Sequence, residues 1–240
     1  MKSSTLIVAQ ALLFTQGFGT RHECIGTIVG GHFQFEGVSI TDPFVELDAA
    51  DGAPYSVKGK SWQFFRKAYL VLNKPAGYEC STKPRHHPSA YSLLPGELRV
   101  RDVQAVGRLD EDTTGLLIFS DDGQFIHKVT SPKHKAHKIY IATLKHAGDD
   151  LLCEKLLKGV MLNDAPDRVM AVSAKLIGET TLELILTEGK YHQVKRMVAA
   201  AGNRVEALHR SMVGTHALRP DCAEGQWYWL TKAELAEIGY

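Results

Sequence analysis

Residues 107–123 of the chain read GRLDEDTTGLLIFSDDG. This stretch places one carboxylate, Asp110, behind Gly-Arg-Leu and just ahead of a turn, and it then predicts an apolar strand over residues 116–120. The Asp-Asp-Gly that follows can cap a helix running to about Val129, because aspartate side chains accept the free amides of a first helical turn. A carboxylate on a tight loop beside a rigid strand is well placed to act on a substrate as a nucleophile or a base.

The rest of the chain mixes short strands with helices, without an internal repeat or a regular alternation of the two. Hydrophobic periodicity and turn residues predict helices over 5–14, 21–29, 149–158, 191–201 and 231–238. Strands are predicted over 32–38, 40–48, 68–72, 103–106, 138–144, 168–176, 181–186 and 205–210. Thr231 and Glu234 fit a capping box, and Gly202 suits the left-handed position after a helix end. We therefore predict an α+β fold with a mostly antiparallel mixed sheet.

Charge divides the chain unevenly. The 240 residues have a net charge of +1, yet residues 1–57 contain two cations and six carboxylates, a net −4, which leaves +5 for the remainder. Residues 58–66 are interpreted as a linker, so we expect a small domain over 1–60 and a larger one over 66–240. A net charge near zero does not by itself indicate a nucleic-acid partner. If RNA is the partner, the second domain should bind most of the RNA.

The cysteine and histidine patterns do not favour a metal site. The four cysteines are widely spaced and form no Cys-x-x-Cys pair, so neither a zinc site nor a dense disulfide framework is predicted. None of the eleven histidines belongs to a His-x-x-x-His or His-Glu-x-x-His pattern. His134 and His137, three residues apart among lysines, are interpreted as part of a basic surface.

The first fourteen residues bear on targeting. Lys2 followed by an apolar run from Leu6 resembles a weak signal peptide, but Gln10 interrupts the run and no clear small-x-small cleavage site follows. The run is also too short to span a bilayer. We therefore expect a core helix here, no membrane partner and a cytoplasmic protein.

Asp110 is bracketed by two further acids, Glu111 and Asp112. The alternative to a functional carboxylate is a solvated acidic turn. Adjacent acids do not make a glycosidase pair, because such a pair must flank its substrate at a set separation. Arg108 can hold the loop or contact a phosphate, and it can equally form a surface ion pair.

Two later segments are candidates for substrate contacts. In the strand predicted around Ile139, Lys138 and Tyr140 point to one face, where a tyrosine can stack on an unpaired base or simply pack in the core. Cations also crowd the glycine turn and first helical turns of residues 188–197, where helix amides and positive charge suit a phosphodiester. A solvated basic helix is the alternative. These cations are Lys190, His192, Lys195 and Arg196.

Four separate motifs occur in the order found in a known family. They are Asn73-Lys74-Pro75-Ala76-Gly77, Gly107-Arg108-Leu109-Asp110, Lys138-Ile139-Tyr140 and residues 189–197, joined by Asp112-Thr113-Thr114-Gly115, Thr130-Ser131-Pro132 and Leu208-His209-Arg210. By these residues the chain resembles the RsuA/RluB-type RNA pseudouridine synthases over about residues 66–234. Residues 77–82 and 121–124 favour the branch that acts on small-subunit (16S) ribosomal RNA, with large-subunit (23S) RNA as the alternative.

The N-terminal part is similar to an S4 RNA-binding module. The match rests on Gly19-Thr20-Arg21 and on Gly37 in a turn between strands. The chain departs from the pattern at residues 4–7, where relatives carry an Arg-Leu-Asp-Lys-like segment, and it has almost no positive charge there. We therefore expect a degenerate S4-like domain.

The resemblance implies conversion of uridine to pseudouridine within RNA. Asp110 would be the essential carboxylate, attacking C1′ or the uracil ring or acting as a base on the sugar. Lys195 would supply its counter-charge, and Tyr140 would stack on the uracil and help to remove the C5 proton. The other residues expected to contact the substrate are Leu186, as an apolar wall, and Arg108, Lys138, His192 and Arg196.

The same resemblance implies the partners. An isomerisation requires no redox cofactor, nucleotide or metal, and the RNA is expected within a small-subunit assembly intermediate, bound by a monomer. One alternative is a non-catalytic RNA-binding assembly protein of the same fold, which would not need Asp110, Tyr140 and Lys195 together. Another is a glycoside- or nucleoside-cleaving hydrolase, which would need a second placed acid.

Overall fold

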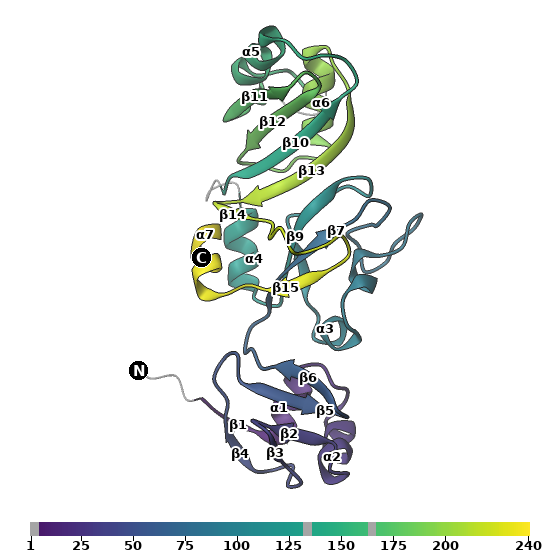
Figure 1. Cartoon of the computed structure of the whole chain (residues 1–240), viewed down its shortest axis with the longest axis vertical. Coiled ribbons are helices and arrows are strands. Elements are labelled where there is room, and N and C mark those ends of the chain that lie inside the picture. Colours follow the sequence, from purple (N-terminus) through teal and green to yellow (C-terminus); the bar gives the residue numbers. More distant parts are fainter. Residues whose placement is uncertain (1–4, 132–135, 163–166) are drawn as a thin grey trace. The chain divides into compact units, whose positions relative to one another are not determined.

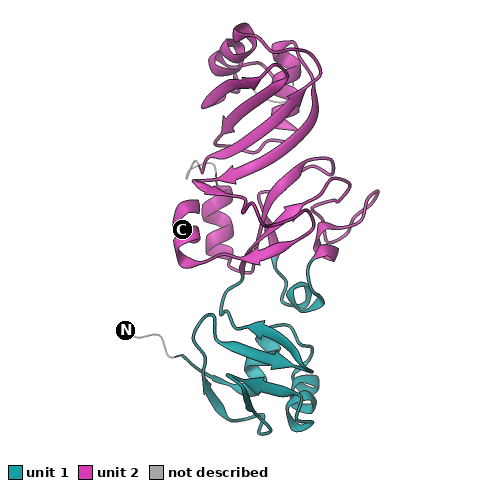
Figure 2. Ribbon diagram, viewed as in Figure 1, with its two compact units in different colours: residues 1–68, 94–103 teal, residues 69–93, 104–240 magenta. Residues whose placement is uncertain are grey.

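The computed structural model describes residues 5–131, 136–162 and 167–240. Of the predicted basic surface, His134 lies outside these residues, whereas His137 is described and exposed; the first four residues and Pro132 of the predicted motif also lie outside them. The chain forms two compact units (Figure 2): the first contains residues up to 68 together with 94–103, and the second contains 69–93 and 104–240. The segment 94–103 thus belongs to the first unit although it lies inside the sequence of the second.

The first unit packs two N-terminal helices and a short third one with two small antiparallel sheets. One sheet has the order β3-β2-β5-β6, and the other pairs β1 with β4 (Figure 1). Its elements are β1 (Leu6–Val8), α1 (Ala9–Thr15), α2 (Arg21–Val29), β2 (Phe33–Phe35), β3 (Val38–Ser39), β4 (Glu46–Asp48), β5 (Pro54–Val57), β6 (Lys60–Gln63) and α3 (Gly96–Val100). The core includes Leu12, Leu13, Ile28 and Phe33, each fully buried.

Three predictions for the first unit were wrong in part. The helix predicted over 5–14 begins only at Ala9, because the preceding residues form β1 and pair with β4. The strand predicted over 40–48 is limited to β4. The predicted linker 58–66 contains β6, which pairs with β5 through a two-residue turn at Lys58 and Gly59. Both turn residues have positive φ, 51° and 78°, the conformation that joins tightly paired strands.

The second unit is built on one mixed sheet of nine strands. Along its main path the order is β11-β12-β10-β13-β9-β7-β15, with β14 paired to β13 and β8 to β9. Among its described pairings only β13 with β9 is parallel, so the predicted α+β fold with a mostly antiparallel sheet is confirmed. The strands are β7 (Tyr69–Lys74), β8 (Gln104–Val106), β9 (Thr114–Ser120), β10 (Lys138–Leu144), β11 (Ser173–Gly178), β12 (Thr181–Leu186), β13 (Val205–Val213), β14 (His216–Ala217) and β15 (Trp227–Trp229).

The helices of this unit follow the predicted caps. They are the 3₁₀ turn η1 (Ala90–Leu93), α4 (Gly123–Thr130), α5 (Asp150–Lys158), α6 (Gln193–Ala201) and α7 (Lys232–Ile238). The Asp122 carboxylate accepts the Gln124 amide at 3.0 Å, and Thr231 with Glu234 forms the capping box that begins α7. Gly202 ends α6 at φ 104°, as predicted. Helices α4 and α7 contribute Phe125, Val129 and Ile238 to a core beneath β7 and β9.

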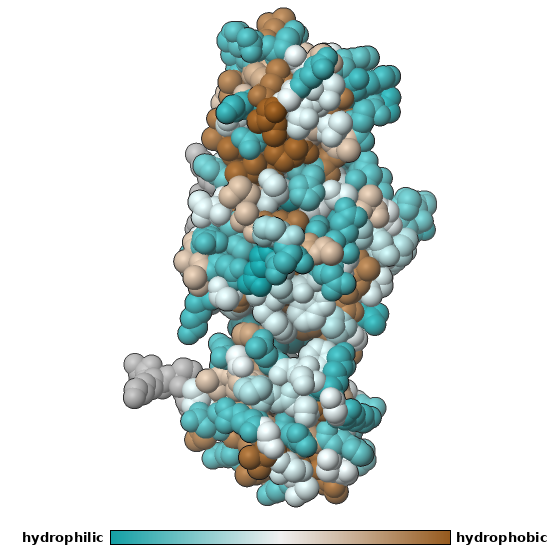
Figure 3. Space-filling view, viewed as in Figure 1, coloured by the Kyte–Doolittle hydropathy of each residue, from teal (hydrophilic) through white to brown (hydrophobic). Residues whose placement is uncertain are grey.

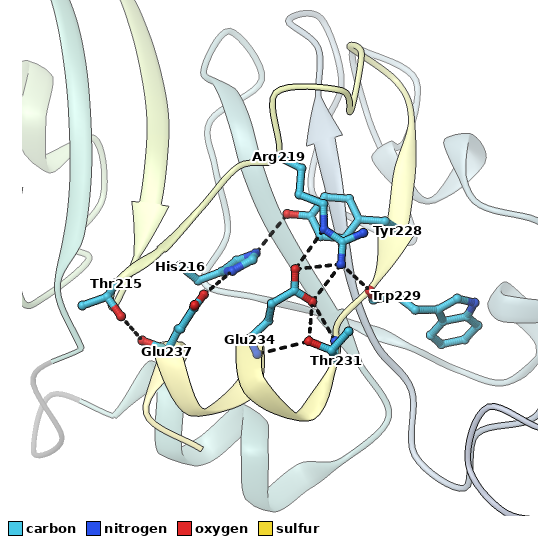
Figure 4. Close-up of polar contacts among 8 residues, drawn as sticks. All are labelled: Thr215, His216, Arg219, Tyr228, Trp229, Thr231, Glu234 and Glu237. Atoms are coloured by element: carbon cyan, nitrogen blue, oxygen red, sulfur yellow. Dashed lines mark hydrogen bonds and ion pairs between the residues drawn. The ribbon is translucent and has the colours of Figure 1, made fainter.

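A network of polar contacts ties α7 to β14 and β15 (Figure 4). The Arg219 guanidinium donates to both carboxylate oxygens of Glu234 at 2.7–2.9 Å, and its carbon lies 4.0 Å from the centre of the Tyr228 ring. The buried imidazole of His216 lies between the Glu237 carboxylate, at 2.9 Å, and the Tyr228 hydroxyl, at 3.0 Å. The C-terminal helix is therefore held by directional contacts as well as by its apolar face.

The surface of the second unit is not uniform. Hydrophobic surface gathers over the end that carries β11 and β12 (Figure 3). In this part of the sequence the exposed large apolar side chains are Leu151, Leu157, Met161, Met170, Val172 and Ile177. In the described part of the chain, no helix is both long and apolar enough to cross a membrane.

Candidate active site

The loop that connects β8 to β9 carries Asp110. Its backbone turns at Gly107, with φ 72°, and again where the Thr113 amide donates to the Asp110 carbonyl at 3.2 Å. At Gly115, with φ 100°, an added Cβ would lie 2.4 Å from the Arg210 carbonyl oxygen, so only glycine allows β9 to approach β13 this closely. The loop is thus placed at the one parallel junction of the described sheet, and the Asp110 side chain remains 23% exposed.

Two buried cations bind backbone carbonyls of this loop and of the residues next to it. Lys74, at the end of β7, is fully buried and donates through Nζ to the carbonyls of Pro75, Glu111 and Thr113 at 2.8–3.0 Å. Arg210, on β13, donates to the carbonyls of Leu116 and Gly107, both at 2.8 Å. Burial lowers the pKa of Lys74, against the pull of nearby acidic groups. Because a buried charge must find partners, these contacts fix the backbone of the loop.

Cys80 adds a contact from the same side. Its buried Sγ accepts the Leu109 amide at 3.4 Å, and burial raises the pKa of the thiol. The Glu111 carbonyl also accepts the Gly77 amide at 2.8 Å. The segment after β7 is therefore joined to the Asp110 loop by hydrogen bonds along its backbone.

Two further basic side chains face the loop from α6 and the turn before it. The Lys195 Nζ lies 3.5 Å from Asp110 Oδ2 and 2.5 Å from Asp112 Oδ1, while His192 Nε2 lies 3.5 Å from Asp110 Oδ1. Burial acts to lower the pKa of Lys195, but the hydrogen bond to Asp112 and the charges of both carboxylates outweigh it, and the pKa is raised. The structure thus brings Lys195 to Asp110, as predicted, but shares it with Asp112.

The turn before α6 is organised by Gln193, which is buried. Its Oε1 accepts the Lys190 amide at 2.8 Å, and its Nε2 donates to Glu188 Oε1 at 3.0 Å. His192 adopts the left-handed conformation, with φ 47°, which is uncommon for a residue other than glycine. Tyr191 stacks on the His192 ring at 3.8 Å between centroids and remains 73% exposed. The imidazole is therefore held between an aromatic ring and the Asp110 carboxylate.

Asp110 lies where an inner cavity adjoins an outer groove. The cavity, of about 60 Å³, is lined by Tyr140, Leu186 and Asp110 among others, and both Tyr140 and Leu186 are otherwise buried. The groove, of about 610 Å³, is lined by three cationic side chains (Arg85, Arg108 and Lys190), three acidic ones (Glu79, Asp110 and Glu111) and three histidines. The residues that line both are Arg108, Leu109, Asp110, Gly189, Lys190 and His192.

Two predicted substrate contacts lie elsewhere. Lys138 is buried and donates to the Ala136 carbonyl at 3.2 Å; burial, helped by the Arg210 charge, lowers its pKa to about 8. Arg196 donates to the Tyr191 carbonyl at 3.1 Å. Neither lines the cavity or the groove. The predicted residues that the structure brings together are Asp110, Tyr140, Lys195, Arg108, Leu186 and His192.

Sequence reasoning gave no role to several residues that shape this site. Lys74 and Arg210 belong to the motifs quoted above, which were the available signal for them. Gln193 and Tyr191 lie inside the motif of residues 189–197 and carry no separate signal. Among residues 5–131, 136–162 and 167–240, no three His, Cys, Asp or Glu side chains are grouped to hold a metal ion.

Comparison with known proteins agrees with this geometry. A family model described as RNA pseudouridylate synthase matches residues 68–200. The ribosomal small subunit pseudouridine synthases A of Salmonella typhimurium and Escherichia coli K12 are each 42% identical to the chain over 71% of its length, and over 74% and 73% of their own. A crystal structure of a pseudouridylate synthase is similar, with a TM-score of 0.68, 29% identity and coverage of 96% of this chain and 98% of that one. The chain therefore belongs to the RNA pseudouridylate synthase family and is an RNA pseudouridine synthase.

Proposed function

We propose that this enzyme isomerises a uridine of small-subunit ribosomal RNA and that Asp110 is its essential carboxylate. The observation that carries the proposal is the position of Asp110, between an inner cavity lined by Tyr140 and Leu186 and an outer groove whose lining includes Arg85, Arg108 and Lys190. The target is supported by the relatives that are 42% identical, which are named for the ribosomal small subunit.

The reaction breaks the C1′–N1 bond, rotates the uracil and joins C5 to C1′, after which C5 loses a proton and N1 gains one. A base inside a helix cannot reach Asp110, so the uridine must be flipped or taken from an unpaired segment. Tyr140 would offer its ring to the uracil face, and Leu186 would close the cavity with an apolar wall. Together they would hold the detached base while it turns.

Asp110 acts as a carboxylate in each of the routes that the chemistry allows. It attacks C1′, attacks the uracil ring, or removes a proton from the sugar, and every route begins with its negative charge. The charge of Lys195, 3.5 Å from that carboxylate, offsets the cost of holding an anion in a partly buried site, and His192 Nε2 lies at the same distance. Electrostatic support of this kind is preorganised before the RNA arrives.

The outer groove would take the RNA backbone. Arg108, Lys190 and His192 line it near the cavity, and Arg85 lies on the segment after β7. Neutralising phosphates with such side chains releases counterions and makes binding depend on salt. Arg108, which lines both spaces, would bind a phosphate next to the flipped nucleotide.

We also propose that the substrate is a small-subunit assembly intermediate, bound by a monomeric enzyme. The first unit would be a degenerate S4-like domain over about residues 1–60, and its net charge of −4 over residues 1–57 predicts little affinity for RNA of its own. Rates measured on naked RNA, on a partly assembled particle and on the mature subunit would test the substrate. Light scattering at working concentration would test the monomer.

Mapping pseudouridines in ribosomal RNA from cells that lack this protein tests the target directly. We expect the loss of a single small-subunit site, restored by the wild-type gene but not by the Asp110→Asn variant. Loss of a large-subunit site instead would contradict the proposed target. Unchanged ribosomal RNA of both subunits would contradict ribosomal RNA as the substrate.

A further inference from the structure

The segment between β7 and η1 forms a loop around one carboxylate. Glu79 accepts three successive backbone amides: those of His86 and His87 bind Oε1 at 2.8 and 2.9 Å, and that of Arg85 binds Oε2 at 3.1 Å. Successive amides that converge in this way form an anion-binding concavity. Here the anion in the concavity is the Glu79 carboxylate of the same chain.

The main chain of the same residue closes the base of the loop. The Glu79 amide donates to the Pro88 carbonyl at 2.9 Å, and the Ala90 amide donates to the Glu79 carbonyl at 2.8 Å. The Ser89 hydroxyl adds a bond to the Ser81 carbonyl at 2.5 Å. Glu79 therefore fixes the loop both at its ends and from its interior.

Hydrogen bonds from His86, His87 and Arg85, in that order, lower the pKa of Glu79 to about 2. Because this is below the ordinary value of 4.5, these hydrogen bonds stabilise the loop fully above that ordinary value, and the stabilisation disappears only as the pH falls through about 2. The carboxylate is thus charged at neutral pH, where its three hydrogen bonds hold the loop.

This loop presents one arginine and two histidines to the outer groove. The side chains of Arg85, His86 and His87 are exposed and line the groove together with Lys190 and His192. Cys80, the residue after Glu79, accepts the Leu109 amide and so connects the loop to the stretch of backbone that carries Asp110. The loop that carries Arg85, His86 and His87 is therefore linked to the Asp110 loop through Glu79 and its neighbour Cys80.

Building on the proposed function, we propose that Glu79 is a positioning residue that shapes the loop so that Arg85, His86 and His87 bind phosphates of the RNA segment next to the target uridine. A carboxylate beside an RNA groove would otherwise repel the backbone. The three backbone amides that bind Glu79 direct its negative charge into the loop, which explains why a carboxylate occurs at this position. If the concavity were instead a phosphate site that Glu79 occupies until RNA displaces it, removing the carboxylate would tighten binding.

The test is a comparison of Glu79→Gln with Glu154→Gln, which removes the same charge from the exposed surface of α5. We expect Glu79→Gln to weaken binding of the small-subunit RNA and to raise KM by roughly fivefold, with kcat within about twofold, since a glutamine amide is neutral and accepts through one oxygen only, which leaves at least one of the three backbone N–H groups opposite its NH2 group. Amide exchange at residues 85–87 should accelerate. Glu154→Gln should change none of these.

Arg85→Gln tests the phosphate contact itself. We expect the slope of log affinity against log salt to become shallower by about 0.7 for each phosphate of a single strand that the variant fails to neutralise. An unchanged slope, or Glu79→Gln binding as tightly as Glu154→Gln or more tightly, would overturn the inference. Failure of the wild type to isomerise ribosomal RNA would refute the proposed function alone, since binding is read separately; failure to bind RNA at all would overturn both.

Discussion

Two pairs of basic side chains contact the same loop, and they contact different parts of it. Lys74 and Arg210 are buried and bind backbone carbonyls, whereas Lys195 and His192 are partly exposed and face the carboxylates of the loop. The inner pair therefore determines the shape of the loop, and the outer pair determines the electrostatic surroundings of the acid. Mutations in the first pair should therefore lower stability as well as activity, whereas mutations in the second pair should lower the rate with little effect on stability.

The largest effect is expected for Lys74→Met. Three carbonyls would be left without their donor in a buried site, so the free energy of unfolding should fall by about 3–5 kcal/mol, and product formation should cease as the loop relaxes. Urea denaturation measures the first and tritium release from C5-labelled uridine the second. Lys138→Met is the control, a buried lysine on another strand. A smaller destabilisation by Lys74→Met than by Lys138→Met would contradict the role of Lys74.

The pH dependence of the free energy of unfolding tests whether Lys138 is desolvated in the folded protein. The pKa of Lys138 is lowered to about 8, so the unfolded state binds more protons between about pH 8 and the ordinary value of 10.5, and folding becomes more favourable as pH rises through that window. Relative to Lys138→Met, the wild type should gain up to about 3 kcal/mol there. Denaturant titrations from pH 7 to 10.5 measure this. A flat difference between the two proteins would show that Lys138 is not desolvated.

Lys195→Met should lower kcat by roughly tenfold to a hundredfold, because Asp110 loses a charge 3.5 Å away. Its stability should change by less than about 1 kcal/mol, since partly exposed ion pairs contribute little. Single-turnover rates and urea denaturation give both numbers. Lys158→Met removes a charge of the same sign from an exposed pair on α5 and should leave the rate unchanged. If Lys195→Met destabilised the enzyme as much as Lys74→Met, the distinction between the two pairs would fail.

The smallest effect is expected for Asp112→Asn. Asp112 is 56% exposed and competes with Asp110 for Lys195, so its neutralisation leaves Lys195 with Asp110 and should change kcat by no more than about threefold. The same single-turnover assay measures it. A decrease as large as that of Asp110→Asn would transfer the essential role to Asp112.

The sequence predicted features that local patterns encode. Alternation gave β10 and β12, and cap residues gave the ends of α4, α6 and α7. The left-handed turn at Lys58 was missed because its conformation is unusual for lysine, and with it β6. Such a turn depends on strand pairing, which a local pattern does not report.

In the site too, local patterns identified some residues, and contacts that depend on the tertiary fold were missed. The motifs identified Asp110, Tyr140 and Lys195, but the partners of Lys74 and Arg210 are backbone carbonyls, which every residue possesses. No pattern of side-chain types can indicate which carbonyls a buried cation will bind. Lys138 was expected to contact the substrate because it shares a strand face with Tyr140. Alternation does not report how deeply a residue lies in the sheet, and Lys138 is buried.

The central claim is that both pairs of basic side chains support Asp110 as the essential carboxylate. Its most direct test is tritium release from small-subunit ribosomal RNA labelled at uridine C5, measured with wild type and Asp110→Asn, with RNA binding and unfolding recorded in parallel. We predict no detectable release by the variant, while its RNA affinity and stability stay close to those of the wild type. Undiminished release by Asp110→Asn would contradict the account.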